Sequence, residues 1–376
     1  MPTNVSKVKN QSREISAPTN RMLWGVSAGM CEYRGCSVLL YEHHVTKEKV
    51  NLAERAHIYA FSKGGTRFSK DKSRNLINNI DNLMLVCGRC HKLIDNKKID
   101  CSAETLLAMK KEHEERIRLI ASIKPNLQNE VIIYNCNIAD QGVKIQDDDA
   151  FNGIIPDYYP ARSSPINLSP ALVLFDNEDI FWDVMATDLE RRFTKHNDSL
   201  DGKPISLFAI APQPLLFKLG KLFNRHFDVS VRQPQGNIST WRWSNNVQTI
   251  EWHISEPLQK EIIDEAVITF EITAQLSDDE LLSIFSKHRI YRIIAKNCSP
   301  SLIKSKMDLL SFAEEYRKVL NRIRKECNSN VNVSLLPIAP ASISIEAGRQ
   351  LMKGDPKITI YDRDFKTKNW VPTLSF

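Results

Sequence analysis

Four cysteines in two close pairs constrain the fold of this chain more than any other feature of its sequence. Cys31 and Cys36 form a C-x4-C pair in MCEYRGCS, and Cys87 and Cys90 form a C-x2-C pair in LVCGRCHK. Four thiolates at this spacing are typical of a structural zinc site, in which they form a tetrahedron around Zn²⁺. Such a site stabilises a small domain that lacks a large core of its own. We therefore expect structural Zn²⁺ here, with buried metal-free thiols as the alternative.

The other cysteines and the start of the chain indicate a reducing compartment. Cys101, Cys136, Cys298 and Cys327 are scattered singly, and such cysteines are most often small buried residues. Residues 1–20 are polar, without the apolar core of a signal peptide, and no apolar run is long enough to span a bilayer. We expect a cytoplasmic protein with no membrane partner, and a mobile arm over residues 1–20.

The net charge of +6 is distributed unequally along the chain. Lys and Arg minus Asp and Glu give 22 − 13 = +9 for residues 1–124 and 29 − 32 = −3 for residues 125–376. This asymmetry indicates that only the N-terminal part meets a polyanion such as nucleic acid. A solvated basic surface with no partner is the alternative.

The N-terminal part shows short strands, one loop and one helix. VLLYEHHV at residues 38–45 and NLMLVC at residues 82–87 are expected strands, and a basic loop at residues 63–75 separates them. The apolar spacing of residues 102–123 predicts a helix that ends before Lys124-Pro125, where we place a domain boundary. The expected domains are therefore residues 21–124 and 125–376.

The C-terminal part alternates strand and helix patterns, which predicts an α/β fold with mainly parallel sheets. The expected strands are ALVLF (171–175), PISLFAIAP (204–212), FDVSVR (227–232), AVITFEIT (266–273), YRIIA (291–295), VNVSLLPIAP (331–340) and KITIYD (357–362). Helical patterns cover residues 179–196 and 308–326.

An internal repeat lies within the C-terminal part. Ile-Ala-Pro at residues 210–212 recurs at residues 338–340, and each copy continues into a helical segment and then a strand. Gly220 and Gly348 occupy the same place in the two copies. The copies span residues 205–232 and 333–361. The repeat predicts two similar halves packed side by side, with chance likeness of two generic βαβ units as the alternative.

His57, Asn82 and His91 occur in this order around the cysteine pairs, and the pattern resembles the HNH nuclease family. The resemblance implies an α+β zinc-stapled ββα-metal domain in which His57 is the general base, Asn82 pins the intervening loop and His91 is a metal ligand. An imidazole near its ordinary pKa can deprotonate water at neutral pH, and Mg²⁺ can neutralise the charge on the leaving oxygen.

The ligands of the catalytic ion are less well defined by the sequence. Asp95 follows His91 by four residues, so on a helix both point to one side; a surface or capping carboxylate is the alternative. Many HNH nucleases have an Asp or His immediately before the base, where this chain has Ala56. The candidates for the missing ligand are Glu54, Glu42, His43 and His44.

Five basic residues follow His57 and are candidates for phosphate contacts on DNA, with a solvated loop as the alternative. They are Lys63, Arg67, Lys70, Lys72 and Arg74. No base-reading motif is evident, so we expect cleavage of double-stranded DNA with little sequence specificity.

The pattern from PISLFAIAPQPLLFKLGKLF through TWRW to SISIEAGRQLMKGDPKITIYDRD resembles the SAVED domain, which consists of two fused CARF-like Rossmann units and binds cyclic oligonucleotides. Together the two resemblances are to the HNH–SAVED effectors of CBASS antiphage systems. They imply a nuclease that a cyclic oligonucleotide, preferably a dinucleotide, activates in abortive infection. We also expect a homo-oligomer on activation, because duplex cleavage needs two active sites.

Ligands of open α/β sheets lie beyond the carboxyl ends of the strands, and aromatic faces stack on bases. The candidate ligand-binding residues are Pro212, Gln213, Trp241, Arg242, Trp243 and Ser342. The alternative for the alternating Trp241 and Trp243 is one face of a core strand. For the whole chain, the alternatives are a restriction-type HNH nuclease that recognises modified DNA and a zinc-stabilised binding protein with an inactive HNH site.

Overall fold

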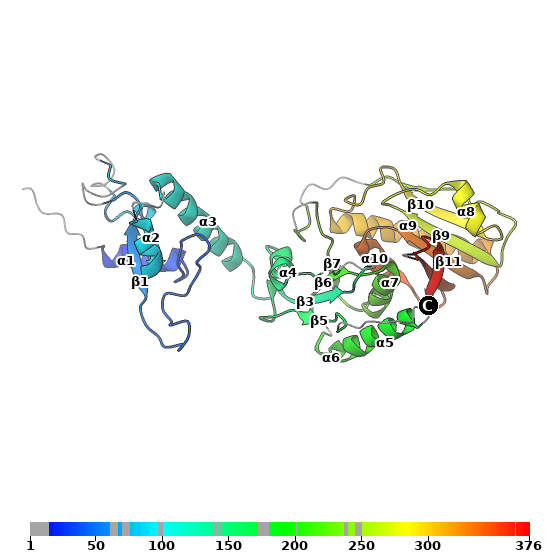
Figure 1. Ribbon diagram of the computed structural model, residues 1–376, viewed down its shortest axis with the longest axis horizontal. Coiled ribbons are helices and arrows are strands. Elements are labelled where there is room, and N and C mark those ends of the chain that lie inside the picture. The colour runs from blue at the N-terminus through cyan, green and yellow to red at the C-terminus, as the bar shows by residue number, and fades with distance from the viewer. Residues whose placement is uncertain are drawn as a thin grey trace, which may run out of the picture. The chain divides into compact units, whose positions relative to one another are not determined.

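The chain forms two compact units that divide between Lys124 and Pro125, at the boundary expected from the sequence. The computed structural model (Figure 1) describes residues 15–60, 67–69, 76–96, 101–138, 142, 144–171, 180–200, 202–236, 240–244, 250–364 and 366–376.

In the N-terminal unit, two antiparallel strands are followed by a helix that packs on them. The elements are α1 (Ala17–Val26), β1 (Ala53–His57), the 3-10 turn η1 (Ile80–Asn82), β2 (Leu83–Cys87), α2 (Gly88–Ile94) and α3 (Ala103–Ala121). Ala53 lies opposite Cys87, and His57 lies opposite Leu83. The β2 residues Leu83 to Val86 are fully buried, so the strand forms the centre of this unit's core.

Two expectations for this unit are confirmed and two are wrong. The strand at 82–87 and the helix at 102–123 appear as β2 and α3, and the side chain of Ser102 caps α3. Residues 38–45 form no strand, because the chain turns back after His43, whose carbonyl accepts a bond from the Lys47 amide. The mobile arm expected over residues 1–20 is wrong for residues 17–20, which are helical and follow the Ser16 cap of α1, and residues 1–14 lie outside the described residues.

The C-terminal unit contains two sheets with helices around them. The first part comprises β3 (Gln128–Asn135), α4 (Asp147–Ile154), β4 (Tyr159–Pro160), β5 (Ile166–Asn167), α5 (Phe181–Thr194), α6 (Asn197–Leu200), β6 (Ile205–Ile210), α7 (Gln213–Leu222) and β7 (Val229–Val231). The second part comprises β8 (Trp252–Ile254), β9 (Glu265–Glu271), α8 (Asp278–Ile284), β10 (Arg289–Ala295), α9 (Lys306–Glu326), β11 (Asn332–Ile338), α10 (Ala341–Gln350), β12 (Lys357–Arg363) and β13 (Trp370–Ser375).

The two sheets share one strand order. In the first sheet β5, β3, β6 and β7 are neighbours and parallel, and the two-residue strand β4 also pairs with β3 in parallel. Leaving β4 aside, the second sheet matches it, since β10, β9, β11 and β12 are neighbours and parallel. Numbered within each half, both orders read 2-1-3-4, as in doubly wound nucleotide-binding folds. The antiparallel strands β8 and β13 lie at the edges of the second sheet. The expected α/β fold with mainly parallel sheets is confirmed, and the expected strand at 171–175 lies almost wholly outside the described residues.

Helices α7 and α10 join the two halves. They are the corresponding helices of the repeat, and each begins directly after an Ile-Ala-Pro segment. Gly220 of α7 lies against the backbone of α10, and Gly348 of α10 lies against the backbone of α7. The expectation of two similar halves packed side by side is therefore confirmed.

Candidate functional site

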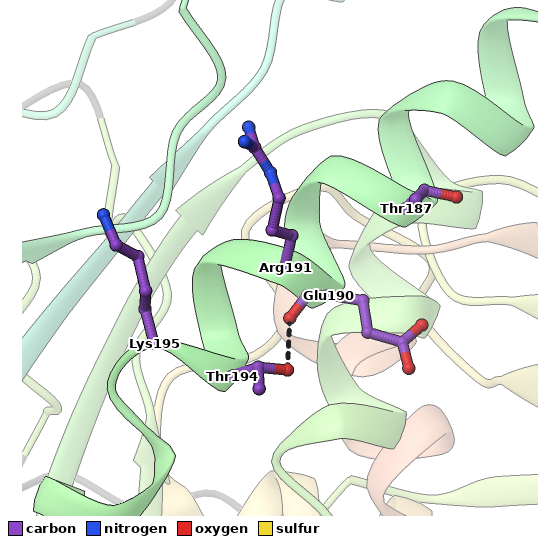
Figure 2. Close-up of a pocket in the computed structure, with 5 residues that line it drawn as sticks. All are labelled: Thr187, Glu190, Arg191, Thr194 and Lys195. Atoms are coloured by element: carbon purple, nitrogen blue, oxygen red, sulfur yellow. Dashed lines mark hydrogen bonds between the residues drawn. The ribbon is translucent and has the colours of Figure 1, made fainter.

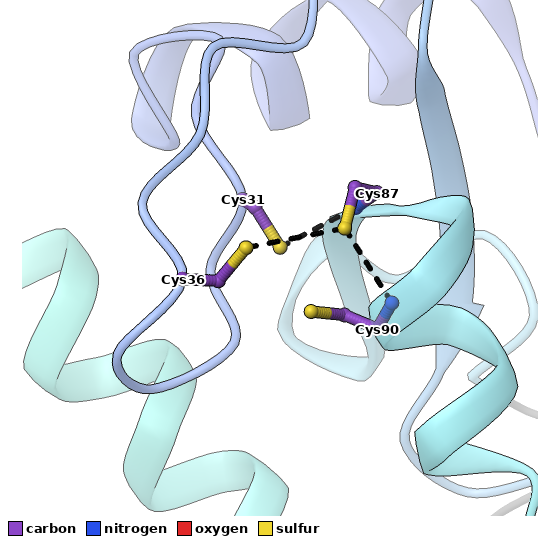
Figure 3. Close-up of side chains that lie close together, drawn as sticks. All are labelled: Cys31, Cys36, Cys87 and Cys90. Carbon is purple, nitrogen blue, oxygen red and sulfur yellow. Dashed lines mark hydrogen bonds between the residues drawn. The ribbon is translucent and has the colours of Figure 1, made fainter.

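The four paired cysteines meet at one point in the N-terminal unit (Figure 3). Their sulfur atoms all lie within 4.8 Å of one another, and the Sγ atoms of Cys36 and Cys87 are 3.9 Å apart. Sulfurs at their usual distance from zinc form a tetrahedron with edges of about 3.8 Å, so this donor set fits Zn²⁺. Among the described residues, no other group of three or more Cys, His, Asp or Glu donors comes together in this way.

Local structure positions these sulfurs. Cys87 ends β2 and caps α2, where its Sγ accepts a hydrogen bond from the Cys90 amide at 3.4 Å, and the Cys31 Sγ accepts one from the Cys87 amide at 3.3 Å. Burial raises the pKa of the Cys31 thiol to about 12 and also raises the pKa of Cys90. A divalent cation has to displace these protons, and amide hydrogen bonds favour the thiolates that result.

His57 and Asn82 lie at the two ends of the segment between β1 and β2. The Asn82 side chain is buried; its Oδ1 accepts a bond from the Tyr59 amide at 2.7 Å, and its Nδ2 donates to the carbonyls of Tyr59 and Leu76. Asn82 therefore holds both ends of the loop together. The Nε2 of half-buried His57 lies 3.2 Å from the Ile77 carbonyl. Because a carbonyl only accepts, this bond requires the proton on Nε2 and makes Nδ1 the nitrogen able to take a proton.

His91 and Asp95 lie one turn apart at the C-terminal end of α2. The His91 Nδ1 is 3.6 Å from one oxygen of Asp95, and the Arg67 guanidinium is 3.4 Å from the other. Glu54 is exposed on β1 and is not gathered with them into a cluster of three donors. The structure thus brings together His91 and Asp95 and does not add Glu54 to them.

The other candidates for the missing ligand lie on the exposed segment that follows the first cysteine pair. Glu42 pairs with Lys47 and Lys49, at 3.5 and 2.6 Å. His43 bonds to Thr46, and its ring lies beside that of His44 at a centroid distance of 4.9 Å. None of these three belongs to a described group of donors near His91.

Arg67 has a structural position in place of the phosphate contact expected for it. Only 6% of its side chain is exposed, and it donates to the carbonyls of His57, Ile58 and Ile94 as well as pairing with Asp95. A guanidinium engaged in this way joins the loop to β1 and α2. The other four predicted DNA contacts, Lys63, Lys70, Lys72 and Arg74, lie outside the described residues.

In the C-terminal unit the two Ile-Ala-Pro segments lie side by side. The Gln213 side chain donates to the Ala339 carbonyl at 2.8 Å and accepts a bond from the Ser344 hydroxyl. Pro212 and Pro340 precede α7 and α10 and provide no side-chain cap for either helix. The predicted residues Pro212, Gln213 and Ser342 therefore belong to one region, at the carboxyl ends of β6 and β11.

Each of these helices is capped from the opposite half of the repeat. The Gln233 side chain accepts a bond from the Ser342 amide at 3.1 Å, and the Asp362 carboxyl accepts one from the Gln213 amide. Gln233 and Asp362 each stand two residues after the corresponding fourth-strand residues of the repeat, Val231 and Ile360. We did not single out these two residues from the sequence, although their repeat positions were a usable signal.

The three aromatic and basic candidates of TWRW do not form one stacking face. Trp241 is 4% exposed and packs edge-on against Phe208 at 5.3 Å, so it is a core residue, but it lies in no strand and shares no strand face with Trp243. Arg242 is exposed and donates to the Asn152 carbonyl at 2.8 Å. Trp243 is half-buried against the main core. The expectation that Trp241 stacks on a base is wrong, because its ring is inside the first half.

Comparison with known proteins identifies the C-terminal unit. Residues 189–376, half of the chain, match the family described as the SMODS-associated and fused to various effectors sensor domain, abbreviated SAVED. The chain belongs to the SAVED family. The resemblance of the C-terminal part to SAVED is thus confirmed, and the nuclease resemblance of the N-terminal part stays a prediction. No curated protein matches the chain in sequence.

Among solved structures, SAVED/CARF-domain receptors are similar at low identity. The Acinetobacter baumannii Cap4 receptor with the cyclic trinucleotide 2'3'3'-cAAA is 12% identical, with a TM-score of 0.44, over 82% of this chain and 67% of that one. The same receptor with the cyclic trinucleotide 3'3'3'-cAAA is 13% identical, with a TM-score of 0.43, over 82% of this chain and 67% of that one. The Moraxella osloensis Cap4 receptor is 14% identical, with a TM-score of 0.37, over 82% of this chain and 66% of that one.

Among the described residues, no helix has both the length and the apolar character that crossing a bilayer requires.

Proposed function

We propose that this SAVED protein is a double-stranded DNA endonuclease that a cyclic oligonucleotide activates in antiphage defence by abortive infection. The observation that carries the proposal is the arrangement of His57, Asn82 and His91 on a zinc-type cysteine cluster, in a chain whose C-terminal half belongs to a sensor family. Membership of SAVED favours a sensor of small ligands over a reader of modified DNA.

The N-terminal unit supports the nuclease part of the proposal. Two antiparallel strands followed by α2 place His57 at the end of β1 and His91 on the helix packed against it. His57 takes a proton from water at Nδ1, since Nε2 donates to the Ile77 carbonyl. Asn82 fixes the loop that begins just beyond this histidine, so it is a positioning residue.

His91 and Asp95 would hold the catalytic Mg²⁺. One or two protein ligands suffice for Mg²⁺ in nucleotide-handling sites, because water and phosphate oxygens complete its shell. When bound, the ion supplies charge neutralisation for the leaving oxygen. Arg67 orients Asp95, and its hydrogen bonds to the carbonyls of His57 and Ile94 link the end of β1 to the end of α2.

The region between the two Ile-Ala-Pro segments supports the ligand part. It lies beyond the carboxyl ends of β6 and β11, the first of which neighbours β3 and the second β9. In each half the strand order reverses between these two neighbouring strands, β3 and β6 in the first half and β9 and β11 in the second. Ligands of doubly wound folds bind at such a switch point. Half-buried Gln213 is the ligand contact we propose. Ser342, also expected from the sequence to contact the ligand, is fully buried and its amide bonds to Gln233. A cyclic dinucleotide is the ligand class we favour over a trinucleotide.

The test is plasmid cleavage with Mg²⁺, without nucleotide and with a panel of cyclic di- and trinucleotides that includes the two cAAA isomers. We expect cleavage with one class of nucleotide and little without. Cleavage that is independent of every nucleotide would contradict the sensor part. Binding of a nucleotide, by calorimetry, without any cleavage would leave a sensor and contradict the nuclease part.

A further inference from the structure

A cavity at the carboxyl end of β10 is bounded by four separate segments of the C-terminal unit. Its volume is about 170 Å³. The segments lie before β8, after β10, before α9 and in the first turn of α9, and the lining residues are Ile250, Glu251, Lys296, Asn297, Leu302, Lys304 and Asp308. Ligands of parallel α/β sheets bind beyond the carboxyl ends of the strands, so the cavity has the position of a ligand site.

The wider hollow along α5 lacks such a setting. It measures about 420 Å³, but α5 and its C-terminal cap Lys195 provide all of its lining (Figure 2). Figure 2 shows Arg191 and Lys195 extending away from the helix, and the Thr194 hydroxyl donates to the Glu190 carbonyl of the same helix at 2.8 Å. One helix cannot surround a ligand, so this hollow carries no site.

The cavity beside β10 combines apolar walls with two polar groups that are free to bind. Ile250 and Leu302 are half-buried and pack against the main core. Asp308 is 4% exposed, and its Oδ2 accepts the amides of Lys304 and Ser305, both at 2.8 Å. No described residue donates to its Oδ1. The Lys304 ammonium is exposed and pairs with no carboxylate in the described part of the chain.

The charges around the cavity favour a neutral ligand group. Glu251 and Lys296 form an ion pair at 2.7 Å, which leaves Asp308 and Lys304 as one negative and one positive group. The four charges sum to zero, so the cavity has no net attraction for a phosphate. A flat group with a donor and an acceptor on its edge matches the free carboxylate oxygen and the free ammonium.

The cavity lies close to the region between the two Ile-Ala-Pro segments. Strands β10, β9 and β11 are parallel and adjacent in that order, so their carboxyl ends are at one edge of the sheet. Neighbouring strands are about 4.8 Å apart, so the ends of β10 and β11 are separated by about 10 Å. The Gln235 side chain donates to the Ile303 carbonyl at 3.0 Å, and Gln233, two residues earlier, accepts the Ser342 amide. One short segment therefore contacts both places.

We propose that this cavity receives one base of the cyclic oligonucleotide whose backbone lies beside the Ile-Ala-Pro segments. The inference rests on the sensor part of the proposed function. A cavity of roughly 150 Å³ holds one benzene ring, so the observed volume suits a single nucleobase that stays partly exposed. Ile250 and Leu302 contact the ring, an N–H on its edge donates to the Asp308 Oδ1, and Lys304 donates to a carbonyl or ring nitrogen. Nucleobases carry such donors and acceptors side by side.

Calorimetry of the full chain with cyclic di-GMP, cyclic di-AMP and 3'3'3'-cAAA tests the base site. Lys304→Glu should weaken binding by about tenfold or more, because a charged donor is lost and a second carboxylate faces Asp308. Lys306→Glu is the matched control: it makes the same change of charge on an exposed lysine of α9 that does not line the cavity, so its affinity should equal that of the wild type. Unchanged affinity in Lys304→Glu overturns the base site and leaves the sensor intact. A wild-type chain that binds none of these nucleotides refutes the sensor part as well.

Protection of a thiol locates the ligand independently of affinity. Asn297→Cys places a thiol on the exposed lining of the cavity, and Lys306→Cys places one outside it. Saturating nucleotide should slow alkylation of Asn297→Cys by iodoacetamide, followed by mass spectrometry of that peptide, and should leave Lys306→Cys unchanged. Equal rates with and without nucleotide overturn the proposal. Equal protection by inorganic pyrophosphate shows that the cavity takes an anion, which also overturns it. Neither measurement requires nuclease activity, so failure of the proposed cleavage is distinguishable from failure of this site.

Discussion

Gly220 and Gly348 occupy equivalent places in α7 and α10, and each packs against the backbone of the other's helix. A Cβ atom on Gly220 would lie 1.9 Å from the Ile345 carbonyl oxygen, and one on Gly348 would lie 2.1 Å from the Phe217 carbonyl oxygen. Neither backbone atom can move aside as a flexible side chain would. The absence of two Cβ atoms therefore sets how closely the two halves of the SAVED unit approach.

Gly220→Ala and Gly348→Ala should each destabilise the C-terminal unit, by about 1–3 kcal/mol or more, because the helices must separate. Urea unfolding followed by tryptophan fluorescence measures this, since five of the six tryptophans lie beyond Pro125. Gly25→Ala in α1 is the control: nothing lies within 4 Å of its added Cβ, so the change should be neutral or slightly stabilising. Equal stability of all three variants would show that the helices are not in close contact.

His57→Ala should lower the rate of DNA cleavage by about 10²–10⁴-fold, because it removes the proposed base. Ligand binding and zinc content should stay as in the wild type, since His57 belongs neither to the sulfur cluster nor to the C-terminal unit. Initial rates on plasmid DNA at saturating nucleotide give the comparison. A variant within about tenfold of the wild-type rate would exclude His57 as the base.

Cys87→Ser should release zinc and unfold the N-terminal unit, because Cys87 both belongs to the sulfur cluster and caps α2. Metal analysis should find one zinc per wild-type chain and none in the variant. Cys298→Ser is the control, since the Cys298 thiol donates to carbonyls of Glu271 and Ala295, as a hydroxyl also can, and lies outside the cluster. Undiminished zinc in Cys87→Ser would refute the four-cysteine site.

Asp362 should make the C-terminal unit more stable at mildly acidic pH. Burial raises its pKa from 3.8 to about 6, against the opposing effect of the Arg363 and Gln213 amides. The folded chain therefore takes up a proton that the unfolded chain does not, and this contribution to stability, present below pH 4, is lost as pH rises through 6. Asp362→Asn should raise the free energy of unfolding at pH 7–8 by about 1–2 kcal/mol and leave it unchanged at pH 4. Unfolding curves of both proteins between pH 4 and 8 decide this, and parallel pH profiles would contradict it.

Activation should involve assembly. The proposed nonspecific nuclease must be held inactive in an uninfected cell, and with the one proposed HNH site per chain, cutting both strands at once takes two chains. A nucleotide that binds the assembled form more tightly shifts the population by that difference in affinity. Size-exclusion chromatography with light scattering should show a larger species with the activating nucleotide, and cleavage should rise steeply with protein concentration. A fully active monomer with nucleotide bound would rule this mechanism out.

The sequence determined the features that depend on spacing along the chain. The two cysteine pairs predicted the sulfur cluster, because short C-x4-C and C-x2-C loops bring each pair of thiols together in almost any local fold. Helix α3 and strand β2 followed from apolar periodicity and from the cap at Ser102. The repeat of Ile-Ala-Pro and glycine predicted two packed halves, because segments with the same pattern fold alike and bury the same face.

Tertiary structure alone decided which side chains face a partner distant in the sequence. Trp241 enters the core against Phe208, and Arg67 is buried between β1 and α2, although both read from the sequence as binding residues. The segment 38–45 has strand composition, but its pairing is limited to single bridges, from Leu39 to Met30 and from Glu42 to Lys49, so no continuous strand forms. Gln233 caps a helix more than one hundred residues away. Periodicity and spacing describe the chain locally, whereas these contacts depend on which distant segments pack together within each unit.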